Sequence, residues 1–211
     1  MKILFLDFDG VITTYDSKWC IDTKKLLLVN DIVSQTDAKI VVTSSWKHGH
    51  IDVDSFKDSI YNKKTDKCSP LCYNKISEKE AIFARFIDQI YDITDSNGSW
   101  RGDEIERWIN AHEDEIESYV ILDDDSDFHE DQLFNFVQTD TFEGLTEREV
   151  KLCVARLNGK RISNPIRMNL ELITKWRNNC HGIEKNNIEQ LLNEYYTSIK
   201  KEFEKFKIVE K

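Results

Sequence analysis

The chain has 211 residues, of which 40% are hydrophobic and 11% aromatic, so it is not intrinsically disordered and can build one well-packed domain. Its net charge of −10 is uneven: residues 1–159 carry 18 basic and 32 acidic side chains, whereas residues 160–211 carry 11 and 7. The first segment therefore has a net charge of −14, which repels polyanions and gives no support to broad nucleic-acid binding.

The sequence also limits where the protein works. No apolar run reaches the roughly 18 residues that a membrane helix needs, and the amino terminus has no basic segment before an apolar core. The five cysteines are an odd number without the spacing of a disulfide framework, which is typical of a reducing compartment. We therefore expect a cytoplasmic protein with no membrane partner.

The first strand is expected at residues 2–6, where an apolar run suits the centre of a parallel sheet. Asp7, Asp9 and Gly10 follow at once, and Phe8 between the two acids alternates to the opposite side, so both acids can face the same way. Ligands bind at the carboxyl ends of strands in open α/β sheets. An acidic turn is the alternative interpretation of this stretch.

A second strand with a polar end is expected farther along. After Asp22, apolar residues at helical spacing predict a helix that covers one face of the sheet. Residues 38–43 then form a β-branched run that ends on the hydroxyls of Thr43 and Ser44. The carboxyl end of this strand thus repeats the pattern of the first.

Residues 48–100 are expected to form a helical and loop insertion near the site. Within them, the capping box at 77–80 predicts a helix to about Tyr91, and residues 95–99 form a loop. Arg101 then begins a helix with acids in its first turn, where they favour the helix dipole.

Two further groups in the sequence resemble metal sites less well. We favour an exposed, unliganded arrangement for His48, His50, Asp52 and Asp54. A zinc site is disfavoured because the second pair lacks the usual spacing in Cys68, Cys72, Cys180 and His181.

A third strand is expected at residues 118–122 and ends in Asp123, Asp124 and Asp127, and residues 134–138 are a candidate fourth strand. A second capping box, at Thr146 and Glu149, starts a helix through Leu157. Alternating strands and helices predict a three-layer, Rossmann-like α/β fold with a central parallel sheet over residues 1–159. Residues 160–211 are expected to form a helical C-terminal extension.

The chemistry of the strand ends indicates phosphoryl transfer. Neighbouring parallel strands would bring carboxylates together, and their repulsion requires a cation. Oxygen ligands alone favour Mg²⁺, which commonly bridges to a phosphate. Asp7 could then act as nucleophile and Asp9 as general acid and base. Thr43, Ser44 and Arg101 could hold the phosphoryl oxygens.

Three segments resemble motifs of the haloacid dehalogenase-like (HAD) hydrolases. Asp7-Phe-Asp-Gly-Val is similar to the first motif, Val41-Val-Thr43 to the second and Leu122-Asp-Asp124 to the fourth. The resemblance implies a nucleophile at Asp7, a general acid/base at Asp9 and a phosphate-binding hydroxyl at Thr43. It implies Mg²⁺ ligands at Asp7, Asp9 (through its carbonyl) and Asp124, phosphate contacts at Ser44 and Gly10, and supporting roles for Asp123, Asp127 and Lys47. For the cation of the third motif we choose Arg101, with Lys47 and Arg107 as alternatives.

Within that superfamily, the chain looks most like a compact subgroup, the HAD domain of Swiss Army Knife RNA repair proteins. The segments that carry this resemblance are Thr43-Ser-Ser-Trp46, Arg101–Trp108, Val120–Asp125 and Gly144-Leu-Thr146. The resemblance implies a Mg²⁺-dependent phosphatase with an aspartyl-phosphate intermediate and no large cap between the first and second motifs. The expected partner is a phosphorylated substrate: a nucleotide, a small metabolite or a nucleic-acid end. A non-catalytic phosphate- or partner-binding module is the alternative.

Overall fold

The computed structural model describes residues 1–62, 77–97, 100–129 and 131–160. These residues belong to one compact unit, Met1–Ile162. The helical extension expected at 160–211 and the disfavoured zinc site fall almost entirely outside the described residues.

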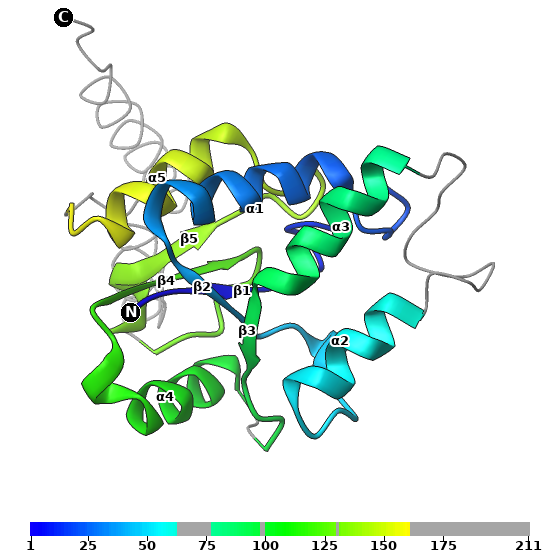
Figure 1. The fold of residues 1–211 in the computed structure, drawn as a ribbon. Helices are drawn as coiled ribbons and strands as arrows, with labels where there is room; N and C mark the ends of the chain where they lie inside the picture. Colours follow the sequence, from blue (N-terminus) through cyan, green and yellow to red (C-terminus); the bar gives the residue numbers. More distant parts are fainter. Residues whose placement is uncertain (63–76, 98–99, 130, 161–211) are drawn as a thin grey trace, which may run out of the picture. The chain divides into compact units, whose positions relative to one another are not determined.

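The described residues contain one parallel sheet with the strand order β3-β2-β1-β4-β5. Its strands are β1 (Lys2–Leu6), β2 (Lys39–Val42), β3 (Ile90–Ile93), β4 (Ser118–Asp123) and β5 (Phe136–Gln138). The helices are α1 (Thr23–Thr36), α2 (Val53–Asn62), α3 (Ser77–Gln89), α4 (Arg101–Ala111) and α5 (Glu147–Leu157). Helices α1, α3 and α5 cover one face of the sheet and α4 lies on the other (Figure 1). The predicted three-layer, Rossmann-like α/β fold is confirmed.

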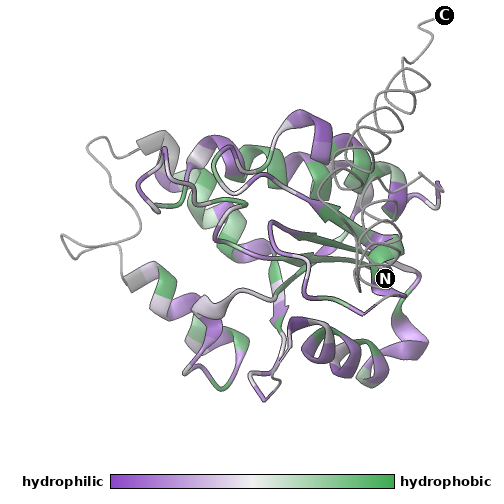
Figure 2. Cartoon of the chain, turned by 180° about the vertical axis from the view of Figure 1, so that it is seen from behind, coloured by the Kyte–Doolittle hydropathy of each residue, from purple (hydrophilic) through white to green (hydrophobic). Residues whose placement is uncertain are grey.

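Both faces of β1 are buried, as the continuous apolar run predicts. Leu4 and Leu6 belong to the core cluster shared with α1, α3 and α5. Phe5 points to the other face, where its ring meets that of Trp108 in α4 edge-on, with centroids 5.4 Å apart. The central strands are accordingly mainly hydrophobic, whereas the helices alternate between hydrophobic and hydrophilic residues (Figure 2). Since side chains alternate along a strand, odd-numbered positions of β1 face α4.

Local capping signals in the sequence are realised at two helices. The Asp22 side chain accepts a hydrogen bond from the Lys24 backbone N–H at the start of α1. At α5, both halves of the predicted capping box form between Thr146 and Glu149. Such caps satisfy backbone N–H groups that lack a partner within the helix.

Strand β3 was missed in the sequence. The helix was expected to continue to about Tyr91, but α3 ends at Gln89 and β3 begins at the next residue. Ile90 continues the helical apolar spacing of Phe86 and Ile87, and no glycine or proline separates the two elements, so periodicity alone does not show the change. The range 48–100, expected to be an insertion, therefore includes an edge strand of the central sheet.

Strand β5 is shorter than the predicted strand, because residues 134 and 135 belong to a 3-10 turn, Gln132–Asn135. None of the described helices combines the length and apolar character needed to cross a membrane. Among the described cysteines, Cys153 is a buried free thiol and Cys20 is disulfide-bonded.

Replacing Thr146 by alanine tests the capping box. Loss of the side-chain acceptor at this N-cap should reduce the free energy of unfolding by about 1 kcal/mol. Ser34→Ala is the control, because this exposed hydroxyl only donates to the Asp31 carbonyl within α1. Urea unfolding of both variants makes the comparison, and equal losses would contradict a specific capping role.

Candidate functional site

The predicted polar residues of three strands meet at one edge of the sheet. Leu6 is in register with Val42 of β2 and Leu122 of β4, so the next positions are Asp7, Thr43 and Asp123. The Asp7 N–H donates to the Leu122 carbonyl and the Thr43 N–H to the Leu6 carbonyl, each at 3.0 Å. By strand alternation, all three side chains point to the side of the sheet that carries α4.

Arg101, the first residue of α4, joins two of these acids. Its Nη1 lies 2.8 Å from Asp7 Oδ1 and also pairs with Asp123 Oδ2. The start of α4 is held by Asp127, whose side chain accepts from the Arg101 N–H and whose carbonyl accepts from the Gly102 N–H at 3.2 Å. The loop after β4 thereby aims the cation at the strand ends.

Asp7, Asp123 and Asp124 place carboxylate oxygens within 4.8 Å of one another. Burial raises the pKa of Asp7 to about 6, although Arg101 acts in the opposite direction. Burial, followed by the charge of Asp7, also raises the pKa of Asp123 well above its usual value. The cluster contains three carboxyl groups and one guanidinium, so their charge is compensated incompletely when all three are ionised. A cluster of carboxylate oxygens with an excess of negative charge fits a Mg²⁺ ion, which prefers oxygen ligands.

Gly10 lets the chain after β1 approach this group of acids. Its φ of +69° is in the left-handed region, and a Cβ atom placed on it would lie 2.2 Å from the carboxyl carbon of Asp124. Its N–H donates to the Thr13 carbonyl at 2.8 Å, so this group serves the turn. Glycine is needed here for both backbone conformation and space.

Asp9 has partners that the sequence did not reveal. Thr13 Oγ1 donates to Asp9 Oδ1 at 2.7 Å, and Trp46 Nε1 donates to Asp9 Oδ2 at 3.0 Å. The Trp46 ring packs on that of Phe8, with centroids 5.5 Å apart. In the sequence, Trp46 is notable only as the end of the segment Thr43-Ser-Ser-Trp46. Nothing in its spacing from Asp9 shows the contact, because the two lie on different strand-end loops.

The hydroxyls after β2 differ in their bonding. Ser44 hydrogen-bonds the Asp7 carboxylate, one of the contacts that oppose the rise in its pKa. Thr43 Oγ1 is buried and has no hydrogen-bond partner within the described residues. An unpaired buried hydroxyl is costly in a folded protein, and a ligand oxygen at the strand ends would satisfy it.

Comparison with known proteins gives one result of consequence. Residues 3–150 match the family model described as the HAD domain in Swiss Army Knife RNA repair proteins. The chain belongs to this family. No curated protein and no solved structure matches it. Membership in this HAD family indicates a HAD-type phosphatase or a related activity.

The three cations considered for the third motif lie in different surroundings within the HAD domain. Arg101 contacts Asp7, as described above. Lys47 Nζ lies 2.8 Å from Glu104 Oε2 and is buried, and Arg107 forms an exposed pair with Asp95 at 2.7 Å. Of these cations, Arg101 has the geometry for a phosphate-contacting role.

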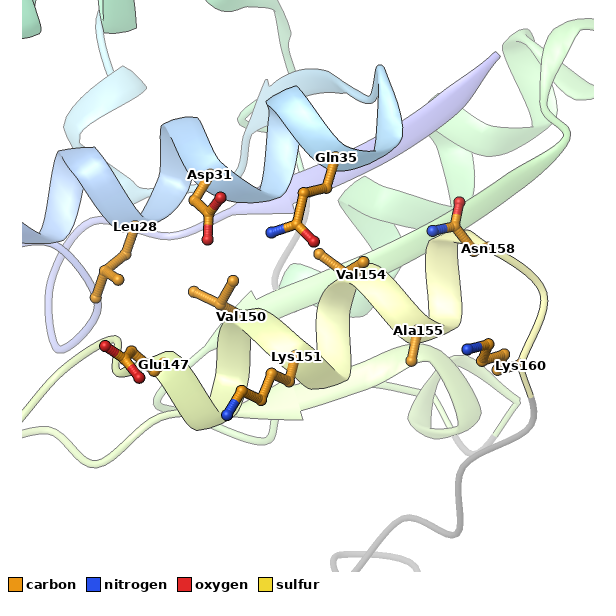
Figure 3. Close-up of a pocket in the computed structure, with 10 residues that line it drawn as sticks. All are labelled: Leu28, Asp31, Gln35, Glu147, Val150, Lys151, Val154, Ala155, Asn158 and Lys160. Atoms are coloured by element: carbon orange, nitrogen blue, oxygen red, sulfur yellow. The ribbon is translucent and has the colours of Figure 1, made fainter. Parts of the chain in front are cut away.

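The HAD domain has two other features that could be mistaken for the functional site. One other group of possible metal ligands occurs in the described ranges, and it consists of Asp103, Glu106 and His129. The histidines at positions 48 and 50 are not part of this group. A groove of about 370 Å³ lies between α1 and α5, with apolar and polar side chains facing each other across it (Figure 3). It contains none of the predicted site residues: it is lined by Leu28, Asp31, Gln35, Glu147, Val150, Lys151, Val154, Ala155, Asn158 and Lys160.

Replacing Gly10 by alanine tests the close approach to Asp124. A left-handed backbone costs a non-glycine residue roughly 1–2 kcal/mol, and Gly10→Ala should lose more because its Cβ also collides with Asp124. Gly159→Ala is the matched control, since φ is +73° there but no atom of the described residues lies within 4 Å of the added Cβ. Urea unfolding compares the two. A loss for Gly10→Ala no greater than that of the control would show that the contact is relaxed in solution.

The raised pKa of Asp7 predicts a pH-dependent effect of Asp7→Asn on stability without metal. A carboxyl with a pKa of about 6 in the folded state and 3.8 in its ordinary state destabilises the fold as pH rises through this interval. In the presence of a metal chelator, Asp7→Asn should therefore have a free energy of unfolding at pH 8 that is higher than that of the wild type by up to about 3 kcal/mol. The gain should vanish at pH 3.5. Denaturation curves at both pH values make the test, and a gain independent of pH would contradict it.

Proposed function

We propose that this HAD domain is a Mg²⁺-dependent phosphatase that hydrolyses a phosphate monoester through an aspartyl-phosphate on Asp7. One observation carries the proposal: Arg101 bridges Asp7 and Asp123 at the strand ends where Thr43 has an unpaired, buried hydroxyl. A nucleophile, a cation and a free donor thus come from β1, α4 and β2. Phosphoryl transfer depends on such positioning and charge compensation.

In the first step, an Asp7 carboxylate oxygen attacks phosphorus and the bond from phosphorus to the ester oxygen breaks. Asp9 gives its proton to the departing oxygen. Arg101 and the Thr43 hydroxyl offset negative charge on the phosphoryl oxygens. The pKa of about 6 for Asp7 leaves it mainly ionised at neutral pH, as a nucleophile requires.

In the second step, Asp9 takes a proton from water, and the water oxygen attacks phosphorus. The bond from phosphorus to Asp7 breaks, which restores the carboxylate and releases inorganic phosphate. The hydrogen bonds of Thr13 and Trp46 hold Asp9 in a fixed orientation between the two steps. Asp9 thus acts in turn as acid and base, as microscopic reversibility requires.

The residues that would hold Mg²⁺ are Asp7, Asp123 and Asp124, with the Asp9 carbonyl as the further ligand that the family resemblance implies. The bound ion would neutralise the carboxylates and polarise a phosphoryl oxygen. Asp127 supports the site through the backbone of α4.

A nucleotide or a nucleic-acid end is the substrate we propose. The description of the matched family as a domain of RNA repair proteins supports this choice. In the described residues, the connection from β1 to β2 consists of the loop 7–22, α1 and two further residues, with no separate cap domain. This connection therefore places no cap domain over the strand ends, which favours a bulky phosphorylated molecule as substrate.

Hydrolysis of an aryl phosphate, with and without Mg²⁺, tests the reaction. Asp7→Asn removes the nucleophile and should reduce kcat at least about 1,000-fold, and Asp9→Asn should reduce it about 100-fold or more. Asp114→Asn is the control, because Asp114 is exposed in the turn before β4, at the opposite ends of the strands from Asp7 and Asp123. If Asp7→Asn were as active as the wild type, the mechanism would be refuted.

The same assay extends to the substrate. Nucleoside monophosphates and phosphate-ended oligonucleotides should be cleaved with a higher kcat/KM than sugar phosphates. The kcat/KM for oligonucleotides should fall steeply as the salt concentration rises if phosphates along the oligonucleotide contribute to binding. Phosphate binding without turnover of any ester would favour the non-catalytic module instead.

A further inference from the structure

Lys47 is a lysine in an unusual position. Its side chain is 1% exposed, although lysine is rarely buried unless it is paired. Its Nζ lies 2.8 Å from Glu104 Oε2 and donates to the Thr43 carbonyl at 3.1 Å. Lys47 therefore contacts Thr43, whose hydroxyl is unpaired within the described residues. No described contact joins Lys47 to Asp7, Asp123 or Asp124.

Glu104 connects this lysine to α4. It lies three residues after Arg101, in the first turn of the helix, and residues with this spacing share one face of a helix. Glu104 Oε2 is also 3.4 Å from the hydroxyl of Thr94, whose N–H donates to the Val42 carbonyl. The ion pair thus joins the ends of β2 and β3 to the turn of α4 that begins with Arg101.

Stability is a poor explanation for this arrangement. Removing two charges from water costs free energy that their attraction often fails to recover, so apolar replacements of a buried pair are commonly as stable. A buried pair does, however, fix the relative positions of the elements that carry its partners. Here those elements carry Arg101 and Thr43.

We propose that the Lys47–Glu104 ion pair is a positioning device for the active site. It holds the first turn of α4 so that Arg101 reaches Asp7 and Asp123, and it holds the Thr43 backbone so that Oγ1 stays directed at the substrate. Neither Lys47 nor Glu104 touches substrate. This inference rests on the proposed phosphatase function and assigns the two residues a role in its rate.

The test uses the double variant Lys47→Met/Glu104→Gln. Methionine keeps the volume of the lysine stem, and glutamine keeps the acceptor for Thr94, so no buried charge is left unpaired. The matched control is Arg107→Met/Asp95→Asn, which removes an exposed ion pair that also ties α4 to the segment after β3.

The double variant should keep its unfolding temperature within about 3 °C of the wild type. Its kcat for the aryl phosphate should fall at least about tenfold, because small displacements of catalytic groups have large effects on rate. KM should change less than about threefold. When the double variant is made in a protein that already carries Arg101→Met, it should reduce kcat by a smaller factor, because the ion pair acts largely through Arg101. Backbone hydrogen exchange should accelerate at Arg101–Glu104. The control should match the wild type in all four measurements.

An unchanged kcat, or a kcat reduced equally by the control variant, would overturn the inference. Failure of the proposed function gives a different result: a wild type that hydrolyses no phosphate ester. In that case hydrogen exchange still decides whether the pair holds the first turn of α4, since unchanged exchange in the double variant would reject that role.

Discussion

A single guanidinium between two buried carboxylates is the interaction on which the site depends. Asp7 and Asp123 follow neighbouring parallel strands in register, so both side chains reach the same side of the sheet, where Arg101 pairs with each of them. Without this cation, burial would hold two like charges together in a medium of low polarity. With it, one negative charge of the pair and that of Asp124 remain when all three acids are ionised, and burial raises the pKa of Asp7 despite the guanidinium. The geometry is therefore suited to a divalent cation and a phosphoryl group.

The surrounding contacts share a purpose: they hold elements that come from distant parts of the chain. Asp127 fixes the start of α4, the Lys47–Glu104 pair fixes its first turn to β2, and Gly10 allows the β1 loop to lie against Asp124. Each contact is polar or steric in a region where the apolar core has ended. Hydrophobic packing, such as Phe5 on Trp108, brings α4 to the sheet, and these directed contacts then set the position of its first residues.

Local signals in the sequence carried much of the fold. The apolar run of β1, the β-branched run of β2 and the capping box at Thr146 are each decided within a few residues, and each is present. Strand β3 was missed because it follows α3 without a turn and its strand character depends on pairing with β2. Of the site, the residues at strand ends were predictable because parallel strands end at one edge. The Trp46 and Thr13 contacts to Asp9 and the role of Glu104 were not.

Residue types at short and fixed spacings specify β1, β2 and β4, the polar residues that follow these strands and the membership of the chain in a HAD family. Which cation meets Asp7 depends on the packing of α4 and of the loop after β2. The sequence favours Arg101 and leaves Lys47 and Arg107 as alternatives. In the fold, Arg101 reaches the acids, Lys47 is buried against Glu104 and Arg107 lies at the surface against Asp95. The physical reason is that ion pairing depends on distance and burial, and for residues far apart in the chain both are set by how helices pack on the sheet.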